Sequence, residues 1–215
     1  MTKTQGRTQA KIGLTLDRVL AAAFDVLEVG GIAKLSTRTI AAELDVSMNT
    51  VMWHIRTKDR LLDLMAEHIL GEIELDDLHG DWHARATRLL GRLRGAMLAH
   101  RDGASIVAGT FPVEPQTLAF ADRLVTVLFD GCPSRKSAAW TSWNLLYFTL
   151  GLVQEEQAAP AAHHGRLREA TDERALPGLH SVLDDFVSID YEQRFRFGIE
   201  QILRSAAVME APETP

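Results

Sequence analysis

The side chains with the most specific chemistry lie close together between Ser47 and Lys58. Asn49 and Thr50 carry hydrogen-bonding groups of the kind that read the edges of bases in a DNA groove. The Ser47 and Thr50 hydroxyls and the Lys58 ammonium are groups that bind phosphate oxygens. These residue types predict contacts with a nucleic acid.

Two short helices joined by a tight turn would hold these side chains at one surface. Ser36 or Thr37 can cap a first helix that runs through Leu44, and residues 45–47 are too few for anything but a turn. A second helix is expected over residues 48–54. Five apolar residues are predicted to form the small core between the two helices: Ile40, Ala41, Leu44, Val46 and Val51.

The outward face of the second short helix is free to enter a groove, because the major groove, about 12 Å wide, admits one α-helix. Base edges would be read by Asn49, Thr50 and His54. Arg38 and Lys58 would act mainly through phosphate. The expected DNA contacts are Thr37, Arg38, Ser47, Met48, Asn49, Thr50, Trp53, His54 and Lys58. Two ordinary surface helices would show a similar pattern, so both interpretations stay open for this stretch alone.

Helical periodicity dominates the rest of the chain, and strand-like alternation is nearly absent. We therefore expect an all-α fold with a three-helix head over residues 1–60 and an effector-binding and dimerisation body over 61–215. Helices are expected at 16–29, at 58–78 after a Thr57 cap, at 82–97, 117–129 and 137–154, and from near Asp190 to Ala206. The segment 157–174 contains Pro160 and Gly165 and predicts a long loop. His100–Arg101–Asp102, next to Gly103, predicts a charged hinge.

Composition and charge bound the class of protein. The single Cys132 excludes an internal disulfide, and no stretch approaches the roughly 20 apolar residues of a membrane span. The first residues lack the apolar region of a secretory signal, so we expect a cytoplasmic protein without a membrane partner.

Residues 1–60 hold nine Lys/Arg against six Asp/Glu, a net charge of +3, and the remainder has a net charge of −9. A basic head on an acidic body is expected when only the head meets phosphate.

Motifs of catalysis are missing from the sequence. It has no nucleophile elbow, P-loop or dinucleotide-binding fingerprint, which argues against an enzyme. His79 and His83 are four residues apart, but Gly80 lies between them, so a metal site is not expected there. No cofactor is expected.

The chain resembles the TetR family of transcriptional regulators. The run from Leu35 to Leu62 resembles the family's DNA-binding domain. In the body, Leu98–Ala104, Gly109–Pro112 and Phe148–Gln157 resemble the regulatory domain of the tetracycline repressor branch. The resemblance covers nearly the whole chain. It implies ten helices, a homodimer formed through a four-helix bundle, a palindromic double-stranded operator and an effector pocket in each body.

In that branch, the resemblance implies a magnesium–drug chelate held by a His, by a Glu of the partner subunit and by polar anchors. Carried over to this sequence, the metal-binding His falls on Val107, which has no lone pair, and the Glu falls on Glu155. The other positions fall on Glu74, Leu89, Phe111, Arg123 and Tyr147, and none of these has the residue type that the family places there. Thr110 and Pro112 are retained.

These departures mostly replace a metal-and-polar site with an apolar and aromatic one. Trp140, Trp143, Asn144 and Tyr147 share one face of a helix, which predicts either a pocket wall or a core or dimer surface. The expected effector contacts, with no metal ligand among them, are Leu89, Leu93, Val107, Thr110, Phe111, Pro112, Arg123, Trp140, Trp143, Asn144, Tyr147 and Glu155.

The sequence thus predicts a repressor that a small apolar or aromatic effector releases from its operator. The alternative is a constitutive DNA-binding dimer with no response to an effector.

Overall fold

The computed structural model describes residues 14–110, 113–158 and 161–208, and its secondary structure in these ranges is entirely helical. The predicted all-α fold is confirmed. The helices are α1 (Leu16–Gly30), η1 (Ile32–Lys34, a 3-10 helix), α2 (Thr37–Glu43), α3 (Met48–Ile55), α4 (Lys58–Gly71), α5 (Trp82–Leu98), α6 (Gly103–Ala108), α7 (Pro115–Phe129), α8 (Arg135–Ala158), α9 (Ala161–Ala170), α10 (Pro177–Ser181), α11 (Leu183–Phe186) and α12 (Tyr191–Val208). The described residues form twelve α-helices and one 3-10 helix, more than the ten helices that the resemblance implied.

A hydroxyl side chain caps the start of each of the first four α-helices. In each case it accepts a hydrogen bond from the backbone N–H three residues further on, which satisfies a donor that the helix itself leaves unpaired. The capping residues are Thr15, Ser36, Ser47 and Thr57. Ser36 is therefore the cap of α2, and the Thr39 hydroxyl accepts from the Ser36 N–H in return.

The three helices of the head share a small apolar core. Ile40, Ala41 and Val51 are buried in it, as predicted, together with Leu27 of α1. Leu44 and Val46 pack at its edge and are only partly buried. The turn between α2 and α3 includes Asp45 in a left-handed conformation, which a short polar side chain tolerates.

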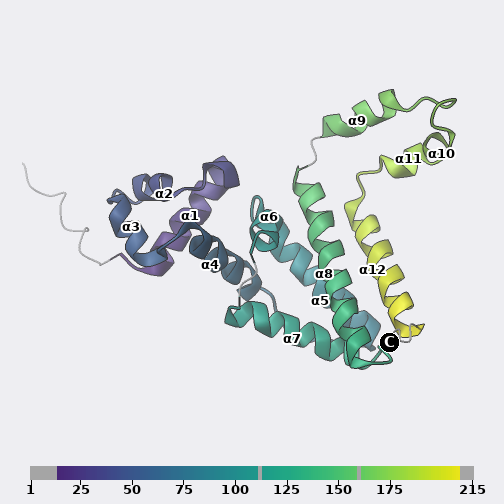
Figure 1. The fold of residues 1–215 in the computed structure, drawn as a ribbon, viewed down its shortest axis with the longest axis horizontal. Helices are drawn as coiled ribbons and strands as arrows, with labels where there is room; N and C mark the ends of the chain where they lie inside the picture. Colours follow the sequence, from purple (N-terminus) through teal and green to yellow (C-terminus); the bar gives the residue numbers. More distant parts are fainter. Residues whose placement is uncertain (1–13, 111–112, 159–160, 209–215) are drawn as a thin grey trace, which may run out of the picture.

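The molecule is elongated, with the head at one end and the body at the other (Figure 1). Helix α4 leads from the head to the body, where α5, α6, α7, α8 and α12 pack together. Helices α9, α10 and α11 form an arm that extends beyond the ends of α8 and α12. Within the described residues, no helix has the length and apolar character needed to cross a membrane.

Two predicted boundaries are wrong. Helix α4 ends at Gly71 instead of continuing to residue 78, and turns and bends follow it. The predicted loop at 157–174 contains the end of α8 and the whole of α9. The Gln157 side chain makes three hydrogen bonds to the backbone of the α5–α6 region, and these hold the last turn of α8. Gly165 lies inside α9, where its cost of roughly 0.5–1 kcal/mol is tolerated.

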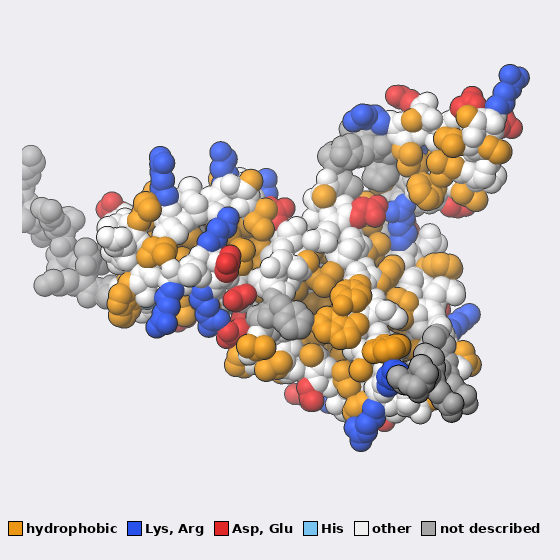
Figure 2. All heavy atoms as spheres, viewed as in Figure 1, with side chains coloured by type: hydrophobic (Ala, Val, Ile, Leu, Met, Phe, Trp, Pro, Cys, Tyr) orange, Lys and Arg blue, Asp and Glu red, His pale blue; other side chains and the backbone are white. Residues whose placement is uncertain are grey.

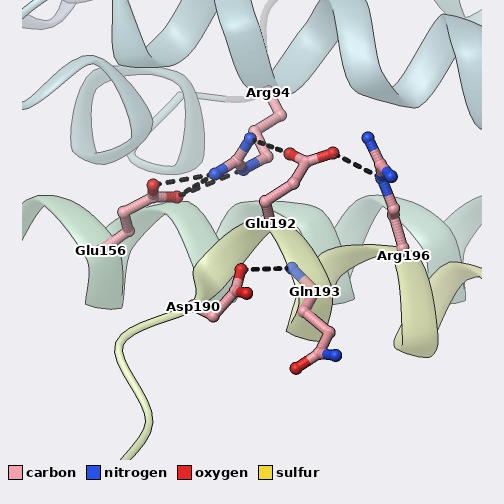
Figure 3. A network of polar contacts seen from close by, with 6 residues as sticks. All are labelled: Arg94, Glu156, Asp190, Glu192, Gln193 and Arg196. Atoms are coloured by element: carbon pink, nitrogen blue, oxygen red, sulfur yellow. Dashed lines mark hydrogen bonds and ion pairs between the residues drawn. The ribbon is translucent and has the colours of Figure 1, made fainter.

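A network of charged side chains connects three helices of the body, α5, α8 and α12 (Figure 3). Arg94 of α5 lies between Glu156 of α8 and Glu192 of α12, with nitrogen–oxygen distances of 2.8 Å to each carboxylate. Glu192 also accepts from Arg196 at 2.7 Å. The Arg94 guanidinium lies over the Phe195 ring, 5.5 Å from its centroid. Because the Arg94 side chain is only 14% exposed, its guanidinium is largely shielded from water and the two carboxylates compensate its charge.

Candidate DNA-binding surface and effector cavity

Helix α3 exposes four of the nine predicted DNA contacts to solvent. Met48, Asn49, Thr50 and Trp53 are exposed, and the Trp53 side chain is 79% exposed. His54 is partly buried, with its ring 4.9 Å from that of Trp53. An exposed indole on a short helix adds little to the packing of the head, so this face is available to a groove.

The first turn of α3 is organised by hydroxyls. The Ser47 Oγ accepts from the Thr50 N–H at 3.2 Å and lies 2.8 Å from the Thr50 Oγ1. These groups surround the N-terminus of α3, where unpaired N–H groups and the helix dipole favour a phosphate. Arg38 on α2 and Lys58 at the start of α4 are also exposed. Thr37 is partly buried, and its hydroxyl contacts the Met52 sulfur at 3.6 Å.

A cavity of about 270 Å³ opens between five helices, α4 to α8, and the residues that join α6 to α7. Its described lining is apolar except for the hydroxyls of Thr110 and Thr117 and the indole N–H that Trp143 carries. The lining residues are Ala66 and Leu70 of α4, Leu93 of α5, Val107, Thr110 and Val113 from α6 and the following segment, Thr117, Leu118, Phe120 and Ala121 of α7, and Trp143, Leu146 and Leu150 of α8.

The structure brings four of the predicted effector contacts to this cavity: Leu93, Val107, Thr110 and Trp143. Phe111 and Pro112 lie outside the described residues. The other six do not line the cavity. Leu89 is fully buried in the core, while Trp140, Asn144 and Tyr147 face solvent. The helical face at 140–147 is thus divided, because Trp143 reaches the cavity and its neighbours do not.

The two remaining predicted contacts, Arg123 and Glu155, are charged and engaged elsewhere. Arg123 donates to the Leu75 carbonyl at 2.8 Å and to the Asp76 carboxylate at 2.6 Å. Glu155 pairs with Arg194 at 3.2 Å. Aligned positions did not reveal this, because a position in an alignment does not fix the direction of a long side chain.

Helix α4 is tied to α7 by charged side chains that the sequence reasoning missed. The Glu67 carboxylate accepts from the N–H groups of Gln116 and Thr117 at 2.7 and 3.1 Å, and from the Thr117 hydroxyl at 3.3 Å. It thereby caps α7, whose own N-cap residue, Glu114, makes no side-chain cap. Arg60 donates to Glu114, and this hydrogen bond raises the pKa of the guanidinium.

The segment 100–102, predicted as a charged hinge, connects the body to the head through hydrogen bonds of Arg101 and Asp102, and we call these contacts the latch. Arg101 donates from its side chain to the carbonyls of Glu28 and Val29 at 3.0 Å each, and from its N–H to the Glu28 carboxylate at 2.9 Å. The Asp102 carboxylate accepts from the Ile32 N–H at 2.7 Å. These bonds join the start of α6 to the end of α1. The cavity wall and the head are therefore connected by two routes, through this latch and through α4.

Comparison with known proteins places the chain in one family. Residues 19–65 match the model "Bacterial regulatory proteins, tetR family", and residues 76–207 match "Tetracyclin repressor-like, C-terminal domain". The chain belongs to the TetR family. TetR proteins are non-enzymatic transcriptional regulators, and this chain is a TetR-family DNA-binding repressor.

The similarity to relatives extends over most of the chain. The Tetracycline repressor protein class A from transposon 1721 of Escherichia coli is 33% identical over 88% of this chain and 88% of its own length. A possible TetR family regulator of Streptomyces coelicolor A3(2) superposes with a TM-score of 0.83 at 34% identity, covering 89% of this chain and 98% of its own. The TetR family protein ActR of Streptomyces coelicolor in complex with actinorhodin has a TM-score of 0.79 at 27% identity, covering 91% and 96%.

Proposed function

We propose that this repressor binds a palindromic operator as a homodimer in the cytoplasm and leaves it when a small apolar or aromatic effector occupies the cavity. The cavity carries this proposal. A volume of about 270 Å³ with an apolar lining is not filled by the protein's described side chains, and such pockets suit small ligands. ActR, a relative of similar fold, is known in complex with actinorhodin, a small molecule.

A magnesium–tetracycline chelate does not fit the residues present. Val107 occupies the position at which the family's metal ligand would stand, and a valine cannot coordinate a cation. Glu155 is retained, but the resemblance assigns it to the partner subunit's site, where one carboxylate alone would hold the ion, and it is paired with Arg194. Among the described residues, no three His, Cys, Asp or Glu side chains converge as metal ligands would. On this proposal, the effector is recognised without a metal.

The proposed signal passes along α4. Ala66 and Leu70 contribute to the cavity, and Lys58 begins the same helix at the DNA-facing end. Its 14 residues span about 21 Å, so a tilt at the cavity moves the head. The effector shifts the population toward the tilted state only as far as it binds that state better. Each 1.4 kcal/mol of preference lowers operator affinity about tenfold.

The proposed dimer buries an aromatic surface that a monomer would expose. Apolar side chains gather on the body around α8 and α12 (Figure 2). Trp140 is 54% exposed and Tyr147 is 63% exposed on α8, and Phe197 is 66% exposed on α12. Exposed apolar patches of this kind mark interfaces. Two-fold pairing of α8 and α12 would give a four-helix bundle and set two α3 helices roughly 34–36 Å apart, one turn of DNA.

Fluorescence titration tests the effector proposal. Trp143 lines the cavity, so a bound aromatic compound should change its emission. We expect saturable changes with members of a panel of aromatic compounds, and release of labelled operator by the same compounds. With tetracycline, magnesium should make no difference. Tight, magnesium-dependent tetracycline binding that releases the operator would overturn the proposal.

Matched variants show which tryptophan produces the fluorescence change. Trp143→Phe should remove the response, whereas Trp53→Phe, which removes an exposed indole of the head that does not line the cavity, should keep it in a titration without DNA. If no compound in the panel binds and the operator is held under all conditions, the protein is a constitutive DNA-binding dimer.

A further inference from the structure

The hydrogen-bonding character of the cavity follows from how its two hydroxyls are already engaged. The Thr110 hydroxyl lies 3.1 Å from the Val107 carbonyl oxygen. The Thr117 hydroxyl lies 3.3 Å from the Glu67 carboxylate. A carbonyl and a carboxylate can only accept, so in both contacts the threonine is the donor.

Each hydroxyl has one hydrogen, and both hydrogens are therefore used within the protein. What these two hydroxyls leave for a ligand is the lone pairs of their Oγ1 atoms. These oxygens can accept hydrogen bonds and cannot donate. A ligand carbonyl or ether oxygen placed against Thr110 or Thr117 would find no donor in either group, and an unsatisfied buried acceptor costs free energy.

No charged side chain lines the described part of the cavity. Arg123 is bound to Leu75 and Asp76, and Glu67 points its oxygens at the N-terminus of α7. An ionised ligand would lose its water shell in this apolar space without a counter-charge, which is far more costly than burying a neutral polar group.

We propose that the effector is an uncharged aromatic molecule that carries a hydrogen-bond donor, such as a phenolic hydroxyl, which it donates to Thr110 or Thr117. This inference rests on the proposed function, since it assumes that the cavity is the effector site. Donation to Thr117 also places the ligand one hydrogen bond from Glu67, and hence from α4. A hydroxyl that accepts a hydrogen bond becomes a stronger donor, so occupancy tightens the contact between α7 and α4.

Calorimetric titration of the full chain with three probes tests this inference. 2-Naphthol is neutral and can donate, 2-methoxynaphthalene has the same rings but can only accept, and 2-naphthoate is an anion. We expect 2-naphthol to bind about three- to tenfold more tightly than 2-methoxynaphthalene, and 2-naphthoate to bind most weakly.

The decisive quantity is the ratio of the first two dissociation constants in wild type and variants. The double variant T110V/T117V keeps the side-chain shapes and should bring the ratio close to one. T110S/T117S keeps both hydroxyls and should retain the wild-type ratio, and the thermal unfolding of each variant checks that it folds. The single variants show which threonine accepts.

An unchanged ratio in T110V/T117V, or tightest binding by 2-naphthoate, would overturn the inference while leaving the cavity as an effector site. Failure of all three probes to bind, with operator binding intact, would overturn the effector cavity itself and the inference with it.

Discussion

At the scale of single residues, Asn49 and Thr50 lie exposed on the first turn of α3, where side chains reach base edges. We predict that Asn49→Ala with Thr50→Ala costs about 1–3 kcal/mol at one base position of the operator and relaxes preference there. Gel shifts with a series of single-base operator variants measure this. An unchanged base preference would mean that another surface of the head reads the DNA.

Lys58 provides the contrasting case, because its exposed ammonium at the start of α4 is expected to reach phosphate, which carries no sequence information. Lys58→Ala should weaken binding to all sequences alike and reduce the slope of log affinity against log salt by about 1. Operator binding measured from low to high salt checks this. A loss confined to one operator sequence would contradict the phosphate role.

Gly31 is required by backbone geometry at the latch. Its φ of +67° is strained for residues with a side chain, and a Cβ there would lie 2.8 Å from an Asp102 carboxylate oxygen. Gly31→Ala should therefore destabilise the fold by about 1–3 kcal/mol. Gly91 is the control, because it lies inside α5 with open space where a methyl group would stand, and Gly91→Ala should stabilise by about 0.5–1 kcal/mol. Thermal unfolding of both variants should move in opposite directions.

Residue-scale features were predictable where the signal is local. The capping hydroxyls at Thr15, Ser36, Ser47 and Thr57 act on N–H groups three residues away, so the sequence contains the whole interaction. The tie between Glu67 and Thr117 spans 50 positions, and nothing local distinguishes Glu67 from other exposed helical carboxylates. The cavity contacts are similarly non-local, which is why Thr117 was missed.

At the scale of elements, the body depends on the charged network between α5, α8 and α12. Arg94→Met should leave Glu156 without its partner and Glu192 with Arg196 alone, and cost about 1–3 kcal/mol, because both Arg94 and Glu156 are largely shielded from water. Arg196→Met is the control, since Arg196 is 73% exposed and should matter by about 0.3–0.5 kcal/mol. Urea denaturation at one protein concentration compares the two, and equal losses would contradict this account.

Periodicity predicted which of the long helices exist, but it did not predict the residues at which they end. Helices α5, α7 and α12 have clear apolar stripes, and they lie within a few residues of their predicted positions. Helix α9 has no clear apolar stripe to predict it, because it lies in the arm away from the core. The last turn of α8 depends on the contacts of Gln157 with a distant part of the chain, which no local pattern encodes.

At the scale of the whole molecule, dimerisation should determine operator affinity. We predict that Trp140→Glu with Phe197→Glu places charges in the proposed interface and gives a monomer that binds half-sites independently and weakly. Val29→Glu is the control, because Val29 is 86% exposed on the head and its side chain takes no part in the proposed interface. Sedimentation velocity at micromolar concentration measures the state, and a monomeric wild type would reject the dimer.

The molecular plan was predictable from the sequence, but the position of the cavity was not. The opposite net charges of residues 1–60 and of the remainder, with the helix-turn-helix pattern, indicated a head and a body. The cavity exists only after five helices assemble, and its lining includes residues from positions 66 to 150. Periodicity identifies the buried face of each helix, but it does not say where that face leaves a space.

The latch between α5 and α6 has a consequence for how such regulators can be recombined. Three of its four hydrogen bonds end on main-chain atoms of the head, in Glu28, Val29 and Ile32. Only one ends on a side chain of the head, the Glu28 carboxylate. Main-chain groups are the same whatever residue carries them. A foreign head with a glycine at position 31 and an acceptor at position 28 would therefore dock on this body with its latch intact. We expect a chimaera with such an exchanged head to take the operator of that head and to keep the effector of this body.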